Sequence, residues 1–167
     1  MVADTKSHVD QPFLEVLVGQ GHLPVSYVSS LLRVLQAAVR EVARSNEDTR
    51  QPFDQEPQPI FHLSAETTED LFILRFTFSD PLDLTPLSTL SKRTFSSFMK
   101  EFSQLLKKLP QPSLWGSSVG GAGRRAYTSE VSRRLDQVRL ELRHFPRVTL
   151  RFDRYTILFE GDRLEIG

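Results

Sequence analysis

The sequence predicts one α+β domain of two layers, a mostly antiparallel sheet of about five or six strands with two or three helices packed on one face. Two patterns support this fold class. Apolar residues recur at steps of three and four in the long segments, which is helical spacing, whereas the short segments alternate apolar and polar residues as half-buried strands do. A chain of 167 residues that is 39% hydrophobic and 25% charged is large enough for one core, so we expect a single domain over residues 1–167.

The first strand and the first helix follow each other closely. Residues 13–18 predict the strand, and the glycines within 19–21 predict the turn after it. Pro24 suits the first position of a helix. From residue 25 to residue 43 the apolar side chains fall on one face, which is the clearest helical pattern in the chain.

The next part of the chain combines a polar stretch with a hairpin. Residues 45–59 are acidic and contain three prolines, which lack the N–H group that helices and sheets use, so we predict an exposed loop. Residues 60–65 and 71–78 alternate as two antiparallel strands joined by the polar turn 66–70. Both faces of the second strand are partly apolar, which indicates some covering on each side.

The C-terminal half predicts two further helices and a meander. The helices span residues 85–109 and 128–144, and a connection rich in glycine and serine, residues 110–126, joins them. The meander has three short strands at residues 148–152, 155–159 and 164–166. The order of the strands in the sheet does not follow from these patterns.

Composition and charge restrict the class of protein. The chain has no cysteine, which excludes disulfides and cysteine nucleophiles and fits a reducing compartment. No apolar run approaches the roughly 20 residues that span a bilayer, and the first residues show no secretory pattern, so we expect no membrane contact and a cytoplasmic location. The formal net charge is zero, yet residues 1–70 are acidic and residues 100–154 are basic. This asymmetry fits two halves that attract each other, or a basic surface for an anionic partner.

The glycine-rich segment 115–126 invites a comparison with phosphate-binding loops, because glycine amides before a helix can bind an anion. Its spacing matches neither a P-loop nor a dinucleotide fingerprint, and it follows a helix rather than a strand. A flexible connection is the preferred interpretation, and an anion-binding loop with Arg124 and Arg125 is the alternative. We predict no cofactor.

The residue types that perform catalysis show no recognisable spacing. The four histidines are scattered without metal-ligand spacing, and no nucleophile elbow of the form Gly-x-Ser-x-Gly is present. We therefore predict no metal site and no catalytic residue. An enzyme whose site forms only in the tertiary structure stays open as an alternative.

Basic side chains form two rows at helical spacing, each opposite the apolar face of its helix. Side by side, the two rows would give one surface for an anionic partner, although a solvent-facing helix surface carries such residues in any case. The rows consist of Arg33, Arg40 and Arg44 on the first predicted helix and Arg93, Lys100 and Lys107 on the second.

The third predicted helix has an ordinary charged surface, on which Arg133, Arg134, Arg139 and Arg143 mix with glutamates. Leu140 points away from the apolar face of this helix. It is either a contact for a partner or one of the apolar residues that every surface retains.

These observations leave three functions open. The preferred one is a non-catalytic protein-interaction module, a subunit or adaptor of a larger prokaryotic assembly, which presents a helical face or a sheet edge to a protein; a homo-oligomer also fits. The second is sequence-nonspecific binding of nucleic acid through the two basic rows, against which stand the neutral pI and the lack of an exposed aromatic platform. The third is an enzyme with a tertiary site.

Overall fold

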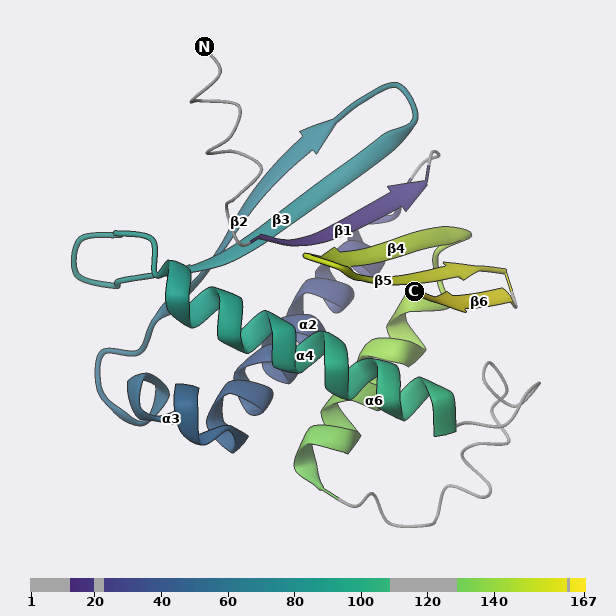
Figure 1. Cartoon of the computed structure of the whole chain (residues 1–167). Coiled ribbons are helices and arrows are strands. Elements are labelled where there is room, and N and C mark those ends of the chain that lie inside the picture. The colour runs from purple at the N-terminus through teal and green to yellow at the C-terminus, as the bar shows by residue number, and fades with distance from the viewer. Residues whose placement is uncertain (1–12, 20–22, 109–128, 162) are drawn as a thin grey trace.

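A six-stranded antiparallel sheet with helices on one face forms the protein (Figure 1). The computed structural model describes residues 13–19, 23–108, 129–161 and 163–167. The strand order is β2-β3-β1-β4-β5-β6, so the predicted fold class is confirmed. The strands are β1 (Leu14–Gly19), β2 (Ile60–Thr67), β3 (Leu71–Ser79), β4 (Arg147–Phe152), β5 (Tyr155–Glu160) and β6 (Arg163–Ile166). The helices are α2 (Val25–Ser45), α3 (Glu47–Asp54), α4 (Ser88–Lys108) and α6 (Glu130–Leu142).

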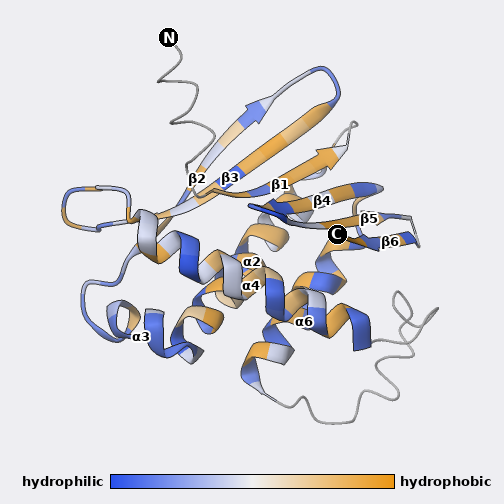
Figure 2. Cartoon of the chain, viewed as in Figure 1, coloured by the Kyte–Doolittle hydropathy of each residue, from blue (hydrophilic) through white to orange (hydrophobic). Residues whose placement is uncertain are grey.

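The core lies between the sheet and the helices. Strand β1 alternates buried and half-buried residues, as the alternation of its side chains predicts. Helix α4 contributes phenylalanines to this core: Phe95 stacks on Phe78 of β3 with ring centroids 5.6 Å apart, and Phe102 lies 6.2 Å from Phe159 of β5. Figure 2 shows hydrophobic residues along β1 and β3 and hydrophilic residues over much of α3.

Part of the segment predicted as an exposed loop, residues 45–59, is helix α3, so that prediction is wrong for Glu47–Asp54. Local capping and one tertiary contact explain the helix. The Asn46 side chain accepts a hydrogen bond from the N–H of Asp48 and caps the first turn. Phe53 is fully buried, with its ring edge-on to Phe78 at 5.2 Å. Burial of one aromatic side chain outweighs the hydrogen bond lost at Pro52.

Helix α6 differs from the predicted charged surface, because Arg139 is fully buried. Its Nε atom lies 2.7 Å from Oδ1 of Asp136, whose side chain is 5% exposed. A buried guanidinium is tolerated when a carboxylate pairs with it. The prediction of an ordinary charged surface is therefore wrong for Arg139.

The remaining element boundaries agree closely with the sequence patterns. Helix α4 begins at Ser88, three residues after the predicted start, because Pro86 forms a β-bridge with Ser79 and the N–H of Leu87 donates to the C=O of Phe78. The chain thus continues strand-like pairing before the helix begins. The predicted connection 110–126 lies outside the described residues.

Candidate protein-interaction surface

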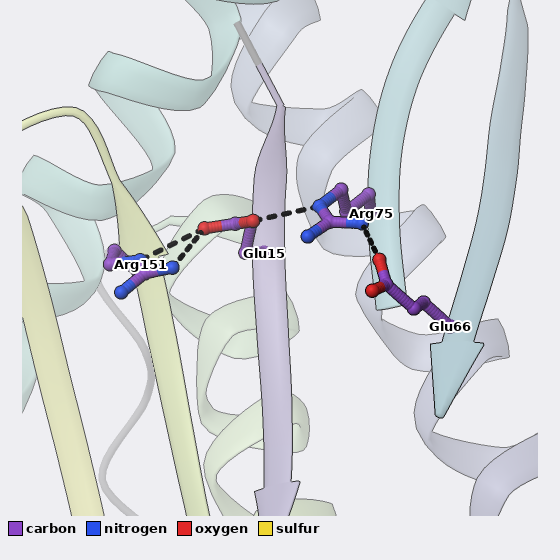
Figure 3. Close-up of polar contacts among 4 residues, drawn as sticks. All are labelled: Glu15, Glu66, Arg75 and Arg151. Carbon is purple, nitrogen blue, oxygen red and sulfur yellow. Dashed lines mark hydrogen bonds and ion pairs between the residues drawn. The ribbon is translucent and has the colours of Figure 1, made fainter. Parts of the chain in front are cut away.

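The face of the sheet opposite the helices carries a row of ion pairs. Glu15 of β1 lies between two arginines: its Oε2 atom is 2.9 Å from Nε of Arg75 on β3, and its Oε1 atom is 2.7 Å from Nη2 of Arg151 on β4. Arg75 extends the row to β2, because its Nη1 atom lies 2.7 Å from Oε2 of Glu66. Figure 3 shows these four side chains crossing four adjacent strands. We call this set the ion-pair row.

Glu15 is the central carboxylate of the ion-pair row, and its side chain is 17% exposed. Burial raises the pKa of Glu15, but hydrogen bonds and charges from Arg75 and Arg151 lower it by more, so that its pKa lies below the ordinary value of 4.5. The alternating charges therefore stabilise one arrangement of side chains across the sheet.

Strand β2 lies at an edge of the sheet, and within the described parts of the chain nothing pairs with its outer side. The direction of its backbone groups follows from the β2–β3 turn, where the N–H of Thr68 donates to the C=O of Leu71 at 2.8 Å. Residues of an antiparallel pair alternate between hydrogen-bonded and non-hydrogen-bonded positions. The β2 residues whose N–H and C=O point away from β3 are therefore Phe61, Leu63, Ala65 and Thr67.

Strand β3 supports this alternation independently. Phe78 faces Phe61 in the register and uses its backbone groups on the side away from β2. Its N–H donates to Oγ of Ser91 at 2.9 Å, and its C=O accepts from the N–H of Leu87 at 2.8 Å. Phe61 and Phe78 are thus a non-hydrogen-bonded pair, and the backbone groups of Phe61 point outward. We call Phe61–Thr67 the open edge.

The two edges of the sheet are protected to different degrees. The open edge contains no lysine, arginine or proline, and its Leu63 is 43% exposed. The opposite edge, β6, is four residues long and carries the exposed side chains of Arg163 and Glu165. Short length and charged side chains are the usual protection of an edge strand, so β6 is better protected than the eight-residue β2, whose charged residue is Glu66.

The three arginines of the basic row predicted on α2 lie in three different environments. Arg33 is exposed in a groove between α2 and α6, next to Arg134. Arg40 is half-buried, and its Nη2 atom donates to the C=O of Pro59 at 3.4 Å, just before the open edge. Burial is the main cause that lowers the pKa of Arg40. Arg44 is exposed near the end of the helix.

The basic row of α4 lies away from the groove that holds Arg33. Arg93 and Lys100 both lie next to Asn46 and Asp48, at the start of α3, so the charge there is mixed. Lys107 is exposed in the last turn of α4. The structure thus places Arg93 and Lys100 in two depressions beside the start of α3, and Arg33 in a separate groove between α2 and α6. Arg124 and Arg125 lie outside the described residues.

Leu140 is half-buried rather than fully exposed. It lies in the groove between α2 and α6, with Arg33 and Ala37 among its neighbours. Part of its side chain therefore packs within the protein, and less of its surface is accessible to a partner than its position on the helix predicted.

A second exposed apolar feature is the loop between β3 and α4, which extends away from the rest of the molecule (Figure 1). Leu82 and Leu84 are 82% and 55% exposed. Hydrogen bonds within the loop hold them: the N–H of Leu82 donates to Oδ1 of Asp80, and the N–H of Thr85 donates to Oδ1 of Asp83. Leu84 has a φ of 60°, which is unusual for a residue with a side chain.

The described residues also form one open depression of about 580 Å³, between the start of α2 and the β2–β3 turn. Its lining is largely apolar and includes Leu23, Val25, Val28 and Phe72.

Across the described ranges, no group of three histidine or acidic side chains is placed to hold a metal ion. No helix in the same ranges has the length and apolar character required to cross a membrane.

Comparison with known proteins gives no family for this chain. No family model matches it, and no match is found among the curated proteins or the solved structures. We therefore infer the function from the fold and the surfaces described above.

The sequence analysis named a sheet edge as one possible contact surface, but it did not identify the strand that forms this edge. The alternating pattern predicted the β2–β3 hairpin correctly, but strand order decides which of the two strands lies at the edge, and the pattern contains no information on order. Local composition does not mark it either: residues 60–67 contain no lysine, arginine or proline, which commonly protect an edge, but the central strand β1 contains none of them as well.

Proposed function

We propose that the protein is a non-catalytic protein-interaction module, a subunit or adaptor, which binds a protein partner by strand addition at the open edge. The observation that supports this most directly is the run of outward N–H and C=O groups from Phe61 to Thr67. In strand addition, main-chain hydrogen bonds supply affinity and alternate side chains supply specificity. An edge of this kind is therefore a binding site of known physical type.

Two further features favour the open edge over other surfaces. Leu63 offers an apolar contact directly beside the free backbone groups. Glu66 is held by Arg75, so one end of the ion-pair row fixes a polar side chain at the same strand. The partner strand would thus find an ordered template rather than one that must be ordered on binding.

The biological setting is part of the same proposal. A cytoplasmic location and membership of a larger prokaryotic assembly fit a cysteine-free subunit. No specific observation supports nucleic-acid binding, because Arg33 lies in a different groove from Arg93 and Lys100 and because Arg40 is half-buried.

A photoreactive amino acid at position 63 tests this function in the cell that makes the protein. We expect Leu63→p-benzoylphenylalanine to give a discrete cross-linked protein on irradiation, identified by mass spectrometry. The matched control carries the same group at Arg154, which is exposed in the turn between β4 and β5. The control should give no discrete product.

A blocking variant makes the result specific. Ala65→Pro removes one outward N–H and leaves the bonds between β2 and β3 in place, because proline is tolerated at such positions of edge strands. It should abolish the cross-link from position 63. If position 63 gives no product beyond that of Arg154, strand addition at this edge is wrong.

A further inference from the structure

We infer that the occupant of the open edge is a second copy of this chain, which pairs its own β2 antiparallel about a two-fold axis at Ser64. This inference rests on the proposed function and names the partner. It follows from the positions of the outward backbone groups and from the side chains that this register places opposite one another. Among the registers that the strand permits, this one uses all four outward residues.

The backbone fits itself in this register. A two-fold axis at Ser64 places Leu63 opposite Ala65 of the second copy, and Phe61 opposite its Thr67. All of these residues direct N–H and C=O outward, so each of the four resulting pairs exchanges two hydrogen bonds. The strands of the two copies then form one continuous sheet, and neither copy retains an unpaired β2 edge.

The side chains on the open face of the sheet are complementary in the same register. His62 lies opposite Glu66 of the second copy, and Glu66 lies opposite its His62, because both are two residues from the axis. An imidazole N–H can donate to a carboxylate across a strand pair. Since Glu66 already binds Arg75, the ion-pair row of one copy would continue into the other (Figure 3).

The side chains on the helix side are complementary in size. Leu63, which is 43% exposed, lies opposite the small side chain of Ala65 in the second copy. Pairing therefore covers the exposed part of one leucine in each copy without placing two large residues against each other. The chain has a formal net charge of zero, so two copies do not repel each other through their overall charge.

The assembly closes at two copies. An isologous contact uses the same surface on both partners and leaves no further copy of that surface free. Among the described strands, the edges that remain are the two β6 strands, which are short and carry Arg163 and Glu165. A dimer, rather than a fibre, is the expected product.

Sedimentation velocity of the purified full chain over a concentration series tests the association. We expect a monomer–dimer equilibrium. Leu63→Lys should raise the dimer dissociation constant by more than about tenfold, because it places a charge at the centre of the edge. Leu82→Lys, at an exposed leucine in the loop between β3 and α4 and outside the open edge, should leave the constant unchanged. Far-UV circular dichroism confirms that both variants fold.

Disulfide formation tests the register, because the chain contains no other cysteine. In the proposed register Ser64 of the two copies form a non-hydrogen-bonded pair with Cα atoms about 4.5 Å apart, which suits a disulfide. Ser64→Cys should therefore give a disulfide-linked dimer under mild oxidation. Glu66→Cys should not, because two copies of position 66 lie about 14 Å apart along the strands. A mixture of His62→Cys and Glu66→Cys should give a disulfide-linked heterodimer, whereas each variant by itself should give no disulfide-linked dimer.

The inference is overturned if the wild-type chain remains a monomer throughout the series, or if Glu66→Cys cross-links as readily as Ser64→Cys. Its failure is distinguishable from failure of the proposed function. A monomer in solution whose position 63 still cross-links to a different protein in the cell keeps strand addition and rejects the second copy. A monomer with no cross-link in the cell rejects both.

Discussion

Leu84 shows how one residue can be held in an unfavourable conformation by its neighbours. Its φ of 60° lies in the left-handed region, which costs a residue with a side chain on the order of 1–2 kcal/mol. Its N–H donates to the C=O of Asp80, and this hydrogen bond fixes the loop around it. More than half of its side chain is exposed, so little packing offsets the cost.

We predict that Leu84→Gly stabilises the protein by up to about 1 kcal/mol, because glycine adopts this conformation without a Cβ penalty. Urea unfolding monitored by circular dichroism measures the change. Leu82→Gly is the matched control: Leu82 is also exposed but has no positive φ, so glycine there should lower stability. A free energy of unfolding for Leu84→Gly below that of wild type would contradict the prediction.

Glu15 links the charge of a single residue to the pH dependence of folding. Its pKa is lowered in the folded state, so the unfolded chain binds more protons as the pH falls through the range between the two values. The stabilisation from Glu15 is therefore complete above the unfolded-state pKa and is lost as the pH falls toward the folded-state pKa. A loss of folding stability at low pH is usual for a carboxylate that gains cationic partners in the folded state.

We predict that Glu15→Gln destabilises the protein at pH 7 and that the difference from wild type shrinks as the pH falls below about 4. Urea unfolding at several pH values measures the difference. Glu101→Gln, at an exposed glutamate of α4, serves as the control and should show little difference at any pH. A Glu15→Gln effect that stays constant with pH would show that the carboxylate charge is not its cause.

At the scale of single elements, α6 depends on a buried ion pair that its sequence pattern did not reveal. The apolar face of the helix, Val131, Leu135, Val138 and Leu142, is buried as expected, but Asp136 and Arg139 are buried as well. Charged residues are rarely buried unless paired, so a pattern based on apolar spacing assigns them to the surface. Only the spacing of three residues between acid and base hinted at the pair.

We predict that Arg139→Met destabilises the protein by about 3–5 kcal/mol, because it leaves the carboxylate of Asp136 buried without this guanidinium. The double variant Asp136→Leu/Arg139→Met removes both charges and should lose less stability than the single variant. Chemical unfolding of the three proteins gives the comparison. A single variant within about 1 kcal/mol of wild type would show that the pair is not required.

Helix α3 shows why composition alone misplaced an element. Three prolines and many polar residues in 45–59 are typical of a loop, and prolines bound the helix on its C-terminal side. A local hydrogen bond from Oγ1 of Thr49 to the C=O of Ala43, at 2.7 Å, holds the start of the helix, and the deciding contact is tertiary: Phe53 packs against Phe78. Contacts to residues distant in sequence are not encoded in a local pattern.

At the scale of the whole molecule, the sequence predicted the elements better than their arrangement. Periodicity predicted the six strands, the three longer helices and the two-layer architecture, because burial on one face imposes a period on the side chains. The order β2-β3-β1-β4-β5-β6 and the exposed edge depend on pairing between distant strands. The candidate site could not be predicted for the same reason, because the strand order decides which strand forms the open edge.

The central position of β1 has a consequence for how the chain folds. Its neighbours in the sheet are β3 and β4, and its pairing with β4 joins residues about 130 positions apart. During synthesis the β2–β3 hairpin can form early from local contacts, whereas β1 gains its second neighbour only once the C-terminal meander has left the ribosome. We therefore expect the sheet to close slowly and late, at the step in which β4 pairs with β1.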